Sequence, residues 1–415
     1  MPSRRQFLSA AALGTASAVP QAARPNVLVV MSDQESALLP GPVKLPNRRR
    51  IETGGVNFSN AFCNTPQCSA ARSALLTGHE PHRTGVLTNV DGSSLGKGLP
   101  VSMPNVGSVF KAAGYRTGYF GKWHLGGGDR LSQFGFDAFE AGSDEAVASA
   151  ASIWIRKQTG PWLAWVSFLN PHHIYELPKP LSGYPVRPGV KPPASALANL
   201  AGKPTEQRQF VDEDQGRQTK DFAPGDWLRY RSYYCELVEK VDAALGTVLD
   251  AVPTLDSTVI AYTTDHGDAL GEHGLPFKGP FMYEELIRIP LVIRAPGLSD
   301  AAGDELVTQT DVAPTLSGLA GVRWPSAVAG RDLSKPHEAR DAVFLEYYAK
   351  QKWTNPIRTV RTRRWKLNWY DRGNKELYDL TADPRELNNL TGKPAAAKVQ
   401  ANLEARLNAW RAPLT

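Results

Sequence analysis

Three short, almost uninterrupted runs of apolar residues each end in a cluster of polar side chains. The runs cover residues 26–31, 162–169 and 258–264, and the clusters cover residues 32–34, 170–173 and 265–268. Apolar runs of this length without alternation are typical of parallel strands that are buried on both faces. Because ligands bind beyond the carboxyl ends of such strands, we expect the three polar clusters to meet in one site.

Segments with helical periodicity separate these runs, at residues 106–113, 233–252 and 312–320. Alternation of buried strands with helices predicts an α/β fold with a doubly wound, mostly parallel sheet covered by helices. Residues 178–219 are rich in proline, glycine and polar residues, which predicts a long loop over the face of the sheet that could face a substrate.

The pattern changes after residue 335 into short strand-like pieces at residues 343–348, 358–360 and 365–370, followed by a final helix at residues 395–410. We therefore expect three parts. Residues 1–23 form a leader, residues 24–335 form the α/β domain, and residues 336–415 form a small α+β subdomain with an antiparallel sheet and a terminal helix.

The composition is that of an ordinary globular protein: 42% of the 415 residues are hydrophobic, and 47 Lys and Arg face 41 Asp and Glu, a net charge of +6. A disordered or fibrous chain is excluded. The charges are interspersed and form no long basic run, so no nucleic-acid partner is expected. The small positive excess indicates a mild preference for anionic ligands.

The first residues resemble a twin-arginine export signal, because Arg4 and Arg5 precede an alanine-rich stretch that ends near Ala23. This resemblance implies passage through the twin-arginine translocase and a periplasmic or secreted protein. No later segment is apolar and long enough to span a membrane, so no stable membrane anchor is expected. The three cysteines, Cys63, Cys68 and Cys235, are an odd number, which argues against a disulfide framework and leaves at least one thiol to explain.

The most informative segment is Pro-Gln-Cys-Ser-Ala-Ala-Arg-Ser-Ala-Leu-Leu-Thr-Gly at residues 66–78. A helix that begins near Cys68 would carry Arg72 on the same face, and the free amides of its first turn could cradle an anion. Taken alone, a buried cysteine near a helix start is the simpler interpretation.

The segment resembles the sulfatase signature, in which a cysteine followed four residues later by arginine, and then by Leu-Leu-Thr-Gly, is oxidised to formylglycine. Three further blocks resemble the same family: residues 114–124, Asp265-His266-Gly267 with Lys278, and residues 377–390. The resemblance covers nearly the whole chain after the leader and implies an alkaline-phosphatase-like fold. Ala70 stands where the commonest form of the signature has proline.

A divalent cation is the first expected cofactor. The side chains that suit such a cation offer mostly oxygen atoms and are Asp33, Gln34, Asp265 and His266. The resemblance implies calcium at these positions, with the modified Cys68 as a further ligand. Gln34 replaces an aspartate and His266 replaces an asparagine found in many members, so manganese or magnesium is also possible.

The resemblance also implies roles for basic residues. Hydrated formylglycine at Cys68, made by a formylglycine-generating maturation enzyme, would attack the sulfur. Arg72, Lys122 and Lys278 would neutralise the sulfuryl oxygens, and His124 would orient and deprotonate the hydrate. His172 would lie at the leaving oxygen, where it would donate a proton or a hydrogen bond together with Lys278.

Other histidines are weaker candidates. His173 is a neighbour that the sequence separates from His172 only by the Pro-His order. The spacing of a zinc-binding helix is absent from His79, Glu80 and His82, so we expect a loop there, with His82 and Arg83 near the substrate.

Three functions remain open at this point. The first is hydrolysis of a sulfate monoester of a carbohydrate or small organic molecule. The second is hydrolysis of phosphonate monoesters or phosphodiesters in the same superfamily, because the same site would stabilise phosphoryl oxygens. The third is binding of sulfated glycans without catalysis, which predicts an unmodified Cys68.

Overall fold

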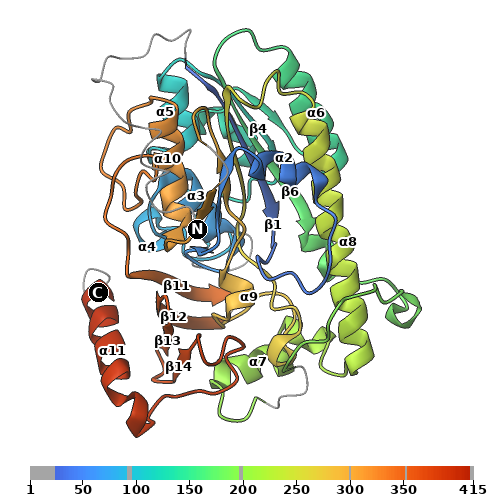
Figure 1. The fold of residues 1–415 in the computed structure, drawn as a ribbon, viewed down its shortest axis with the longest axis vertical. Helices are drawn as coiled ribbons and strands as arrows, with labels where there is room; N and C mark the ends of the chain where they lie inside the picture. Colours follow the sequence, from blue (N-terminus) through green and yellow to red (C-terminus); the bar gives the residue numbers. More distant parts are fainter. Residues whose placement is uncertain (1–23, 91–95, 196–199, 299–300, 351–352, 412–415) are drawn as a thin grey trace.

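The structure is a computed structural model that describes residues 24–90, 96–195, 200–298, 301–350 and 353–411. Its core is an eight-stranded sheet with the order β5-β4-β6-β1-β7-β8-β2-β9 (Figure 1). The strands are β1 (Asn26–Asp33), β2 (Gly55–Phe58), β4 (Arg116–Gly121), β5 (Ala138–Glu140), β6 (Trp162–Pro171), β7 (Thr258–Thr264), β8 (Val292–Arg294) and β9 (Ala301–Gly303). The three strands predicted from apolar runs, β6, β1 and β7, are parallel neighbours, which confirms the α/β sheet.

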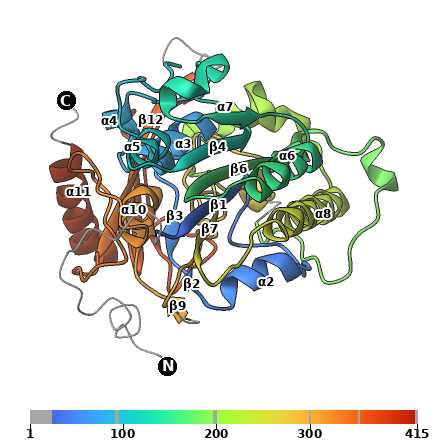
Figure 2. The ribbon, with the colours of Figure 1, turned by 90° about the horizontal axis from the view of Figure 1, so that it is seen from above.

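Helices cover both faces of this sheet (Figure 2). The helices are α2 (Pro46–Glu52), α3 (Cys68–Thr77), α4 (Pro81–Thr84), α5 (Val106–Ala112), α6 (Asp144–Arg156), α7 (Thr205–Glu213), α8 (Pro224–Leu249), α9 (Glu284–Ile287), α10 (Val312–Leu319) and α11 (Ala397–Arg411). Short 3-10 turns are η2 (Gly128–Phe134), η3 (His172–Tyr175), η4 (Leu181–Gly183), η5 (Gln215–Gln218), η6 (Glu272–Gly274), η7 (Gln309–Asp311) and η8 (Pro394–Ala396).

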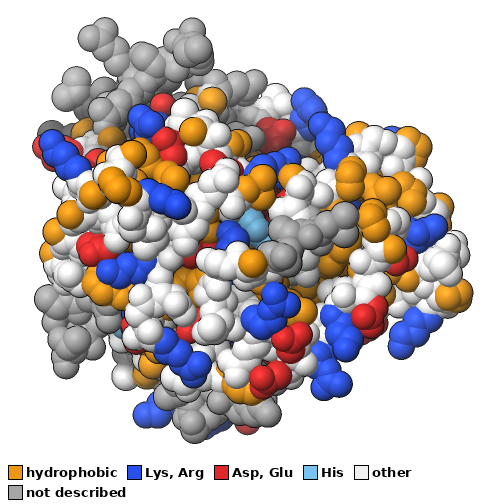
Figure 3. All heavy atoms as spheres, turned by 90° about the horizontal axis from the view of Figure 1, so that it is seen from below, with side chains coloured by type: hydrophobic (Ala, Val, Ile, Leu, Met, Phe, Trp, Pro, Cys, Tyr) orange, Lys and Arg blue, Asp and Glu red, His pale blue; other side chains and the backbone are white. Residues whose placement is uncertain are grey.

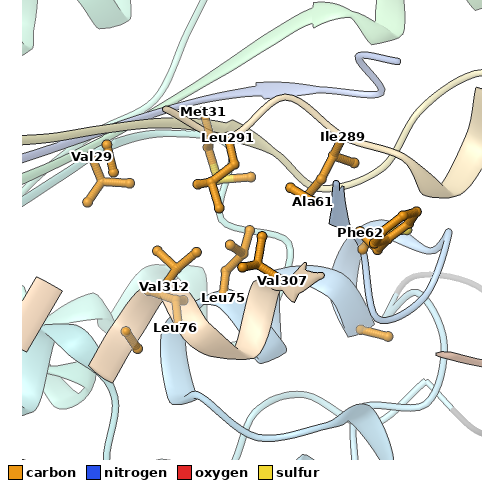
Figure 4. Close-up of a cluster of buried hydrophobic side chains, with 14 of the residues drawn as sticks. Val29, Met31, Ala61, Phe62, Leu75, Leu76, Ile289, Leu291, Val307 and Val312 are labelled. Carbon is orange, nitrogen blue, oxygen red and sulfur yellow. The ribbon is translucent and has the colours of Figure 1, made fainter. Parts of the chain in front are cut away.

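Strand β1 shows why a continuous apolar run is needed. Val29 and Met31 point to the face that carries α3 and α10, where they share one core with Leu75 (Figure 4). Leu28 and Val30 point to the opposite face and share a second core with α6 and α8. Because alternate side chains of a strand face opposite sides, a strand that is covered on both faces must be apolar at every position.

A second sheet lies in the C-terminal part of the chain and is antiparallel, with the order β11-β12-β13-β14. Its strands are β11 (Ala342–Lys350), β12 (Trp353–Thr362), β13 (Trp365–Tyr370) and β14 (Lys375–Asp379). A separate two-stranded sheet consists of β3 (Ala61–Phe62) and β10 (Val307–Thr308). Helix α11 packs against β12 and β13. The predicted antiparallel sheet and terminal helix are present, and the boundary at residue 335 stays a prediction.

Two helical segments differ from the sequence prediction. The expected loop at residues 178–219 contains α7 and η5, and α8 begins at Pro224, nine residues before the predicted start at 233. Arg231 interrupts the apolar periodicity there. It is nevertheless buried, because its guanidinium donates to the Leu270 carbonyl and pairs with Glu272.

Three predictions concern the leader, membrane spans and the thiols of the chain. The predicted leader, residues 1–23, lies outside the described residues. Within the described ranges, no helix is long and apolar enough to cross a membrane. Cys63, Cys68 and Cys235 are all buried and none is in a disulfide, as the odd count indicated.

On the face in Figure 3, acidic and basic side chains are mixed, with apolar ones between them.

Glu285 in α9 should make stability depend on pH. It is 4% exposed, and burial together with the charges of Glu272 and Glu386 raises its pKa from 4.5 to about 8. The folded protein therefore holds a proton that the unfolded chain loses near pH 4.5, so stability falls as pH rises from there to about 8. We expect Glu285→Gln to remove this loss, worth about 1.4 kcal/mol for each unit of pKa shift.

Urea unfolding at pH 5 and at pH 8.5 measures this effect. The advantage of Glu285→Gln over the unsubstituted protein should grow with pH, whereas the same change at exposed Glu213 should leave the pH dependence as it is. Stability curves for Glu285→Gln that run parallel to the unsubstituted protein would contradict the assignment.

Candidate active site

The expected site forms where the carboxyl ends of the parallel strands meet. Asp33 ends β1, Asp265 follows β7, His172 follows β6, and Lys122 follows β4. Cys68 is the first residue of α3, as the sequence predicts. The polar clusters from distant parts of the chain therefore lie together, as the rule for doubly wound sheets requires.

Four side chains form a compact group that fits a cation. Ligand atoms of Asp33, Cys68, Asp265 and His266 all lie within 4.8 Å of one another, and all four residues are buried. The ring Nδ1 of His266 lies 2.8 Å from the carbonyl oxygen of Gly267, which can only accept, so Nδ1 carries the proton. His266 Nε2 thus faces the cluster, and in the neutral ring this nitrogen carries the lone pair that binds a metal.

The two buried carboxylates of this group oppose each other's ionisation. Burial and the charge of Asp33 raise the pKa of Asp265, although His266 and Arg72 act against this. Burial also acts against ionisation of Asp33, but Lys122, His172, Arg72 and Lys278 hold its pKa well below the ordinary value. A divalent cation would relieve this repulsion, so the donor set fits such an ion.

Gln34 contributes an amide oxygen with a fixed orientation. Its Nε2 donates to Asp268 Oδ2 at 2.8 Å, so its Oε1 faces the other way and accepts from Lys278 Nζ at 3.1 Å. Tyr230 donates to the same Asp268 carboxylate. Asp268 therefore orients the Gln34 amide.

Two lysines surround the Cys68 sulfur. Lys278 Nζ lies 2.7 Å from Sγ and Lys122 Nζ lies 3.8 Å from it, while His266 Nε2 is at 3.3 Å. Burial and Asp33 work against ionisation of the thiol, but the two lysines and His266 hold its pKa well below the ordinary value. The surroundings of Cys68 therefore stabilise negative charge at this position.

Arg72 lies within the cluster and is not among the residues that line the cavity. Its guanidinium donates to Asp33 at 2.9 Å, to Asp265 at 3.0 Å and to the Ser167 hydroxyl at 2.7 Å. The first turn of α3 also differs from the expected anion cradle, because the Ser69 amide already donates to Asn89 Oδ1. Arg72 therefore orients the carboxylates.

Two glycines of the matched motifs are required by close backbone approaches. A Cβ at Gly121 would lie 1.9 Å from the Ser167 carbonyl oxygen, and one at Gly267 would lie 2.0 Å from the Glu285 carbonyl oxygen. Both contacts are sterically impossible for any other residue, and Gly121 also has a φ of 100°. These approaches place Lys122 and His266, the respective neighbours, in the site.

A cavity of about 560 Å³ opens beside Cys68. Its described lining residues are Gln67, Thr88, Asn89, Lys122, His124, His172, Tyr175, Gln215, Lys278 and Lys350. His124 and His172 are thus in the cavity, whereas His173 contacts Asn170 instead. His82 binds Glu346 and packs against Trp410 rather than lining the cavity.

Six of these lining residues were not candidates from the sequence. They are Gln67, Thr88, Asn89, Tyr175, Gln215 and Lys350. Gln67 directly precedes Cys68, and its place next to that motif was the one available signal. Lys350 ends β11 and Gln215 begins η5, so both reach the site through packing of distant segments.

The protonation states separate the two candidate proton donors. Burial, with the charges of Lys278 and Lys122, lowers the pKa of His172 to about 3, although Asp33 acts in the opposite direction. Burial tends to lower the pKa of Lys278 too, but Cys68, Asp33 and Asp265 raise it overall. At neutral pH, His172 is a neutral hydrogen-bonding group and Lys278 is the group that carries a proton.

A doubly wound sheet with this buried cluster and helix-borne Cys68 at its carboxyl edge defines an alkaline-phosphatase-like hydrolase. The chain belongs to the sulfatase family: the Sulfatase model matches residues 25–322, and the model for the C-terminal part of N-sulphoglucosamine sulphohydrolase matches residues 271–413. The protein is therefore an enzyme that hydrolyses sulfate esters.

Characterised relatives are distant but match over most of their length. An ulvan-active sulfatase of Formosa agariphila is 28% identical, over 93% of this chain and 80% of the relative. A Delta 4,5-hexuronate-2-O-sulfatase of Bacteroides thetaiotaomicron is 28% identical, over 93% and 88%. The solved structure of a 2-O GAG sulfatase superposes with a TM-score of 0.84 at 25% identity, over 94% and 92%.

A phosphonate monoester hydrolase of Agrobacterium radiobacter superposes with a TM-score of 0.78 at 23% identity, over 94% of this chain and 96% of that one. A similarity at this level of identity shows the shared fold alone. The family assignment thus favours the first of the three functions left open by the sequence.

Proposed function

We propose that this protein hydrolyses a sulfate monoester of a carbohydrate, with formylglycine derived from Cys68 and a divalent cation as its reactive groups. The observation that carries the proposal is the position of Cys68. It begins α3 within one group of atoms with Asp33, Asp265 and His266, and two lysines lie beside it. The amide and hydroxyl side chains that line the adjoining cavity suit the hydroxyl groups of a sugar.

The residues that would hold the cation are Asp33, Gln34, Asp265 and His266, together with the modified Cys68. Three of the side chains offer oxygen atoms, so calcium is the first choice, and the imidazole of His266 also suits manganese or magnesium. When bound, these groups supply a hydroxyl nucleophile and positive charge that polarises the sulfuryl oxygens.

The chain's own residues prepare the site for the developing negative charge. Lys122 and Lys278 lie close enough to Cys68 to contact sulfuryl oxygens, and Arg72 keeps Asp33 and Asp265 in place. Lys278 carries the proton that the leaving oxygen needs, and His172 holds that oxygen by a hydrogen bond from its neutral ring. His124, in the same cavity, is the candidate for orienting and deprotonating the nucleophilic hydroxyl.

The proposed cellular path begins with maturation. The Arg4-Arg5 segment supports export through the twin-arginine translocase to the periplasm or beyond. That route carries folded proteins, so a formylglycine-generating enzyme would act on Cys68 before export. Ala70 in the signature makes this conversion the step to be measured.

Peptide mass spectrometry across Cys68, together with turnover of aryl esters, tests the proposal. On protein from the native host, we expect an aldehyde or its hydrate at residue 68, and aryl sulfate hydrolysed at least about tenfold faster than aryl phosphonate. Active protein with an unmodified thiol would refute the proposed nucleophile. Faster phosphonate hydrolysis would refute the substrate class.

A further inference from the structure

The part of the cavity away from the nucleophile has a distinct chemical character. Apart from the lysines and histidines around Cys68, the described lining consists of amides, one hydroxyl, one phenol and one further lysine: Gln67, Asn89, Gln215, Thr88, Tyr175 and Lys350. No carboxylate is among the lining residues that the structure describes. A cationic substrate group would thus find no opposite charge there.

The amide of Asn89 can only donate into the cavity. The backbone N–H of Ser69 donates to its Oδ1 at 3.1 Å. Because a backbone N–H cannot accept, this contact fixes which end of the amide is oxygen. Asn89 is partly exposed, and its Nδ2 has no hydrogen-bond partner among the described residues, so this NH₂ group is available to a substrate.

Lys350 fixes Gln215 in the same way. Its ammonium donates to Gln215 Oε1 and to the Lys278 carbonyl oxygen at 3.1 Å. An ammonium only donates, so the NH₂ end of the partly exposed Gln215 is free of protein acceptors within the described part of the chain. The carboxylate of Asp214 forms an ion pair with Lys350 at 3.3 Å, but it lies outside the cavity lining, so the two amide NH₂ groups remain the donors that face the cavity.

We infer that Asn89, Gln215 and Lys350 form a subsite for a second anionic oxygen group on the sugar that carries the scissile sulfate. That group is a carboxylate or a second sulfate. Such groups only accept hydrogen bonds, and those they accept from amides are stronger than the bonds of neutral acceptors. This inference rests on the proposed function and names its substrate class. The class is sulfated sugars that carry a second anionic group, rather than choline sulfate or sugars whose only charge is the scissile sulfate.

The two amides allow a test in which the fold is kept. In Gln215→Glu and Asn89→Asp the new carboxylates can still accept from Lys350 and from the Ser69 amide, so the internal contacts remain. Each change replaces a free NH₂ donor by a negatively charged acceptor. Binding is measured by calorimetry in protein that also carries Cys68→Ala, so that no probe is hydrolysed.

Three monosaccharides serve as probes. A sulfated uronic acid and a disulfated hexosamine are the anionic probes. A hexose monosulfate is the neutral probe, because its sugar carries no charge besides the scissile sulfate. We expect the Cys68→Ala protein to bind at least one anionic probe about tenfold or more tightly than the neutral probe. Gln215→Glu and Asn89→Asp should each weaken binding of the preferred anionic probe by about tenfold or more and change binding of the neutral probe by less than about threefold. The probe whose binding is weakened identifies the second group as carboxylate or sulfate.

Gln218→Glu is the matched control, because Gln218 is exposed at the other end of η5 and does not line the cavity. It adds the same charge and should change the binding of no probe. Equal affinity for all three probes, or equal weakening of all three by Gln215→Glu, would overturn the inference.

The outcomes below distinguish failure of the proposed subsite from failure of the proposed function. Turnover of aryl sulfate by mature protein with intact Cys68 reports the function without the subsite. Turnover combined with equal binding of the three probes overturns the subsite alone. Absence of turnover in protein shown to carry formylglycine overturns the function.

Discussion

Replacement of Cys68 by alanine is expected to lower kcat/KM for aryl sulfate by about four orders of magnitude or more. The residue supplies the proposed nucleophile, and the one aliphatic hydroxyl in the described cavity lining, that of Thr88, already donates to the Ala349 carbonyl oxygen. The substitution removes one sulfur from a polar cluster, so the fold should remain. Steady-state kinetics on purified protein and far-UV circular dichroism measure the two effects.

Cys235→Ala is the matched control. Cys235 is also a buried, free cysteine, but it lies in α8 and not in the active-site cluster. It should retain activity within about threefold. Activity of Cys68→Ala above about one hundredth of that of the unsubstituted protein would place the nucleophile elsewhere.

Replacement of Asp33 by asparagine is expected to reduce both metal affinity and catalysis. Asp33 is fully buried, and its Oδ2 accepts from Lys122 at 2.6 Å and from Arg72 at 2.9 Å. A neutral amide removes a charged oxygen ligand and leaves both cations short of a counter-charge. We expect affinity for calcium to fall by about a hundredfold or more, and kcat by about a thousandfold.

Calorimetric titration of calcium into chelator-treated protein gives the affinity directly, independent of turnover. Asp242→Asn is the control, because Asp242 is also buried but binds the backbone amides of Asn47 and Arg48 at the start of α2. It should lower thermal stability and leave calcium affinity unchanged. Unaltered calcium binding by Asp33→Asn would remove Asp33 from the proposed ligand set.

Some structural predictions failed where polar side chains are buried. Strand β14 is not predictable from the pattern of its residues, because Glu376 interrupts the apolar positions. In the structure the Glu376 carboxylate is buried and accepts hydrogen bonds from Tyr370, Tyr378 and Tyr283. A pattern of hydrophobic and polar positions cannot identify a strand whose polar residue is satisfied by partners from other segments.

The sequence by itself determined the parts of this protein that depend on near neighbours. Continuous apolar runs gave three central parallel strands, and the residues at their ends identified the edge where the site forms. The motif around Cys68 gave the start of α3 and the family. These features could be predicted because strand and helix periodicity, and the spacing of a motif, are properties of consecutive residues.

Only the tertiary structure decided which groups of the site are free to act. Arg72 was expected to contact sulfuryl oxygens, but packing places it on Asp33 and Asp265. Gln215 and Lys350 come together from segments 135 residues apart. The direction of an amide, and whether a charge is available to a substrate, depend on the hydrogen-bond partners that distant segments bring to it, and those partners are set by packing rather than by local sequence.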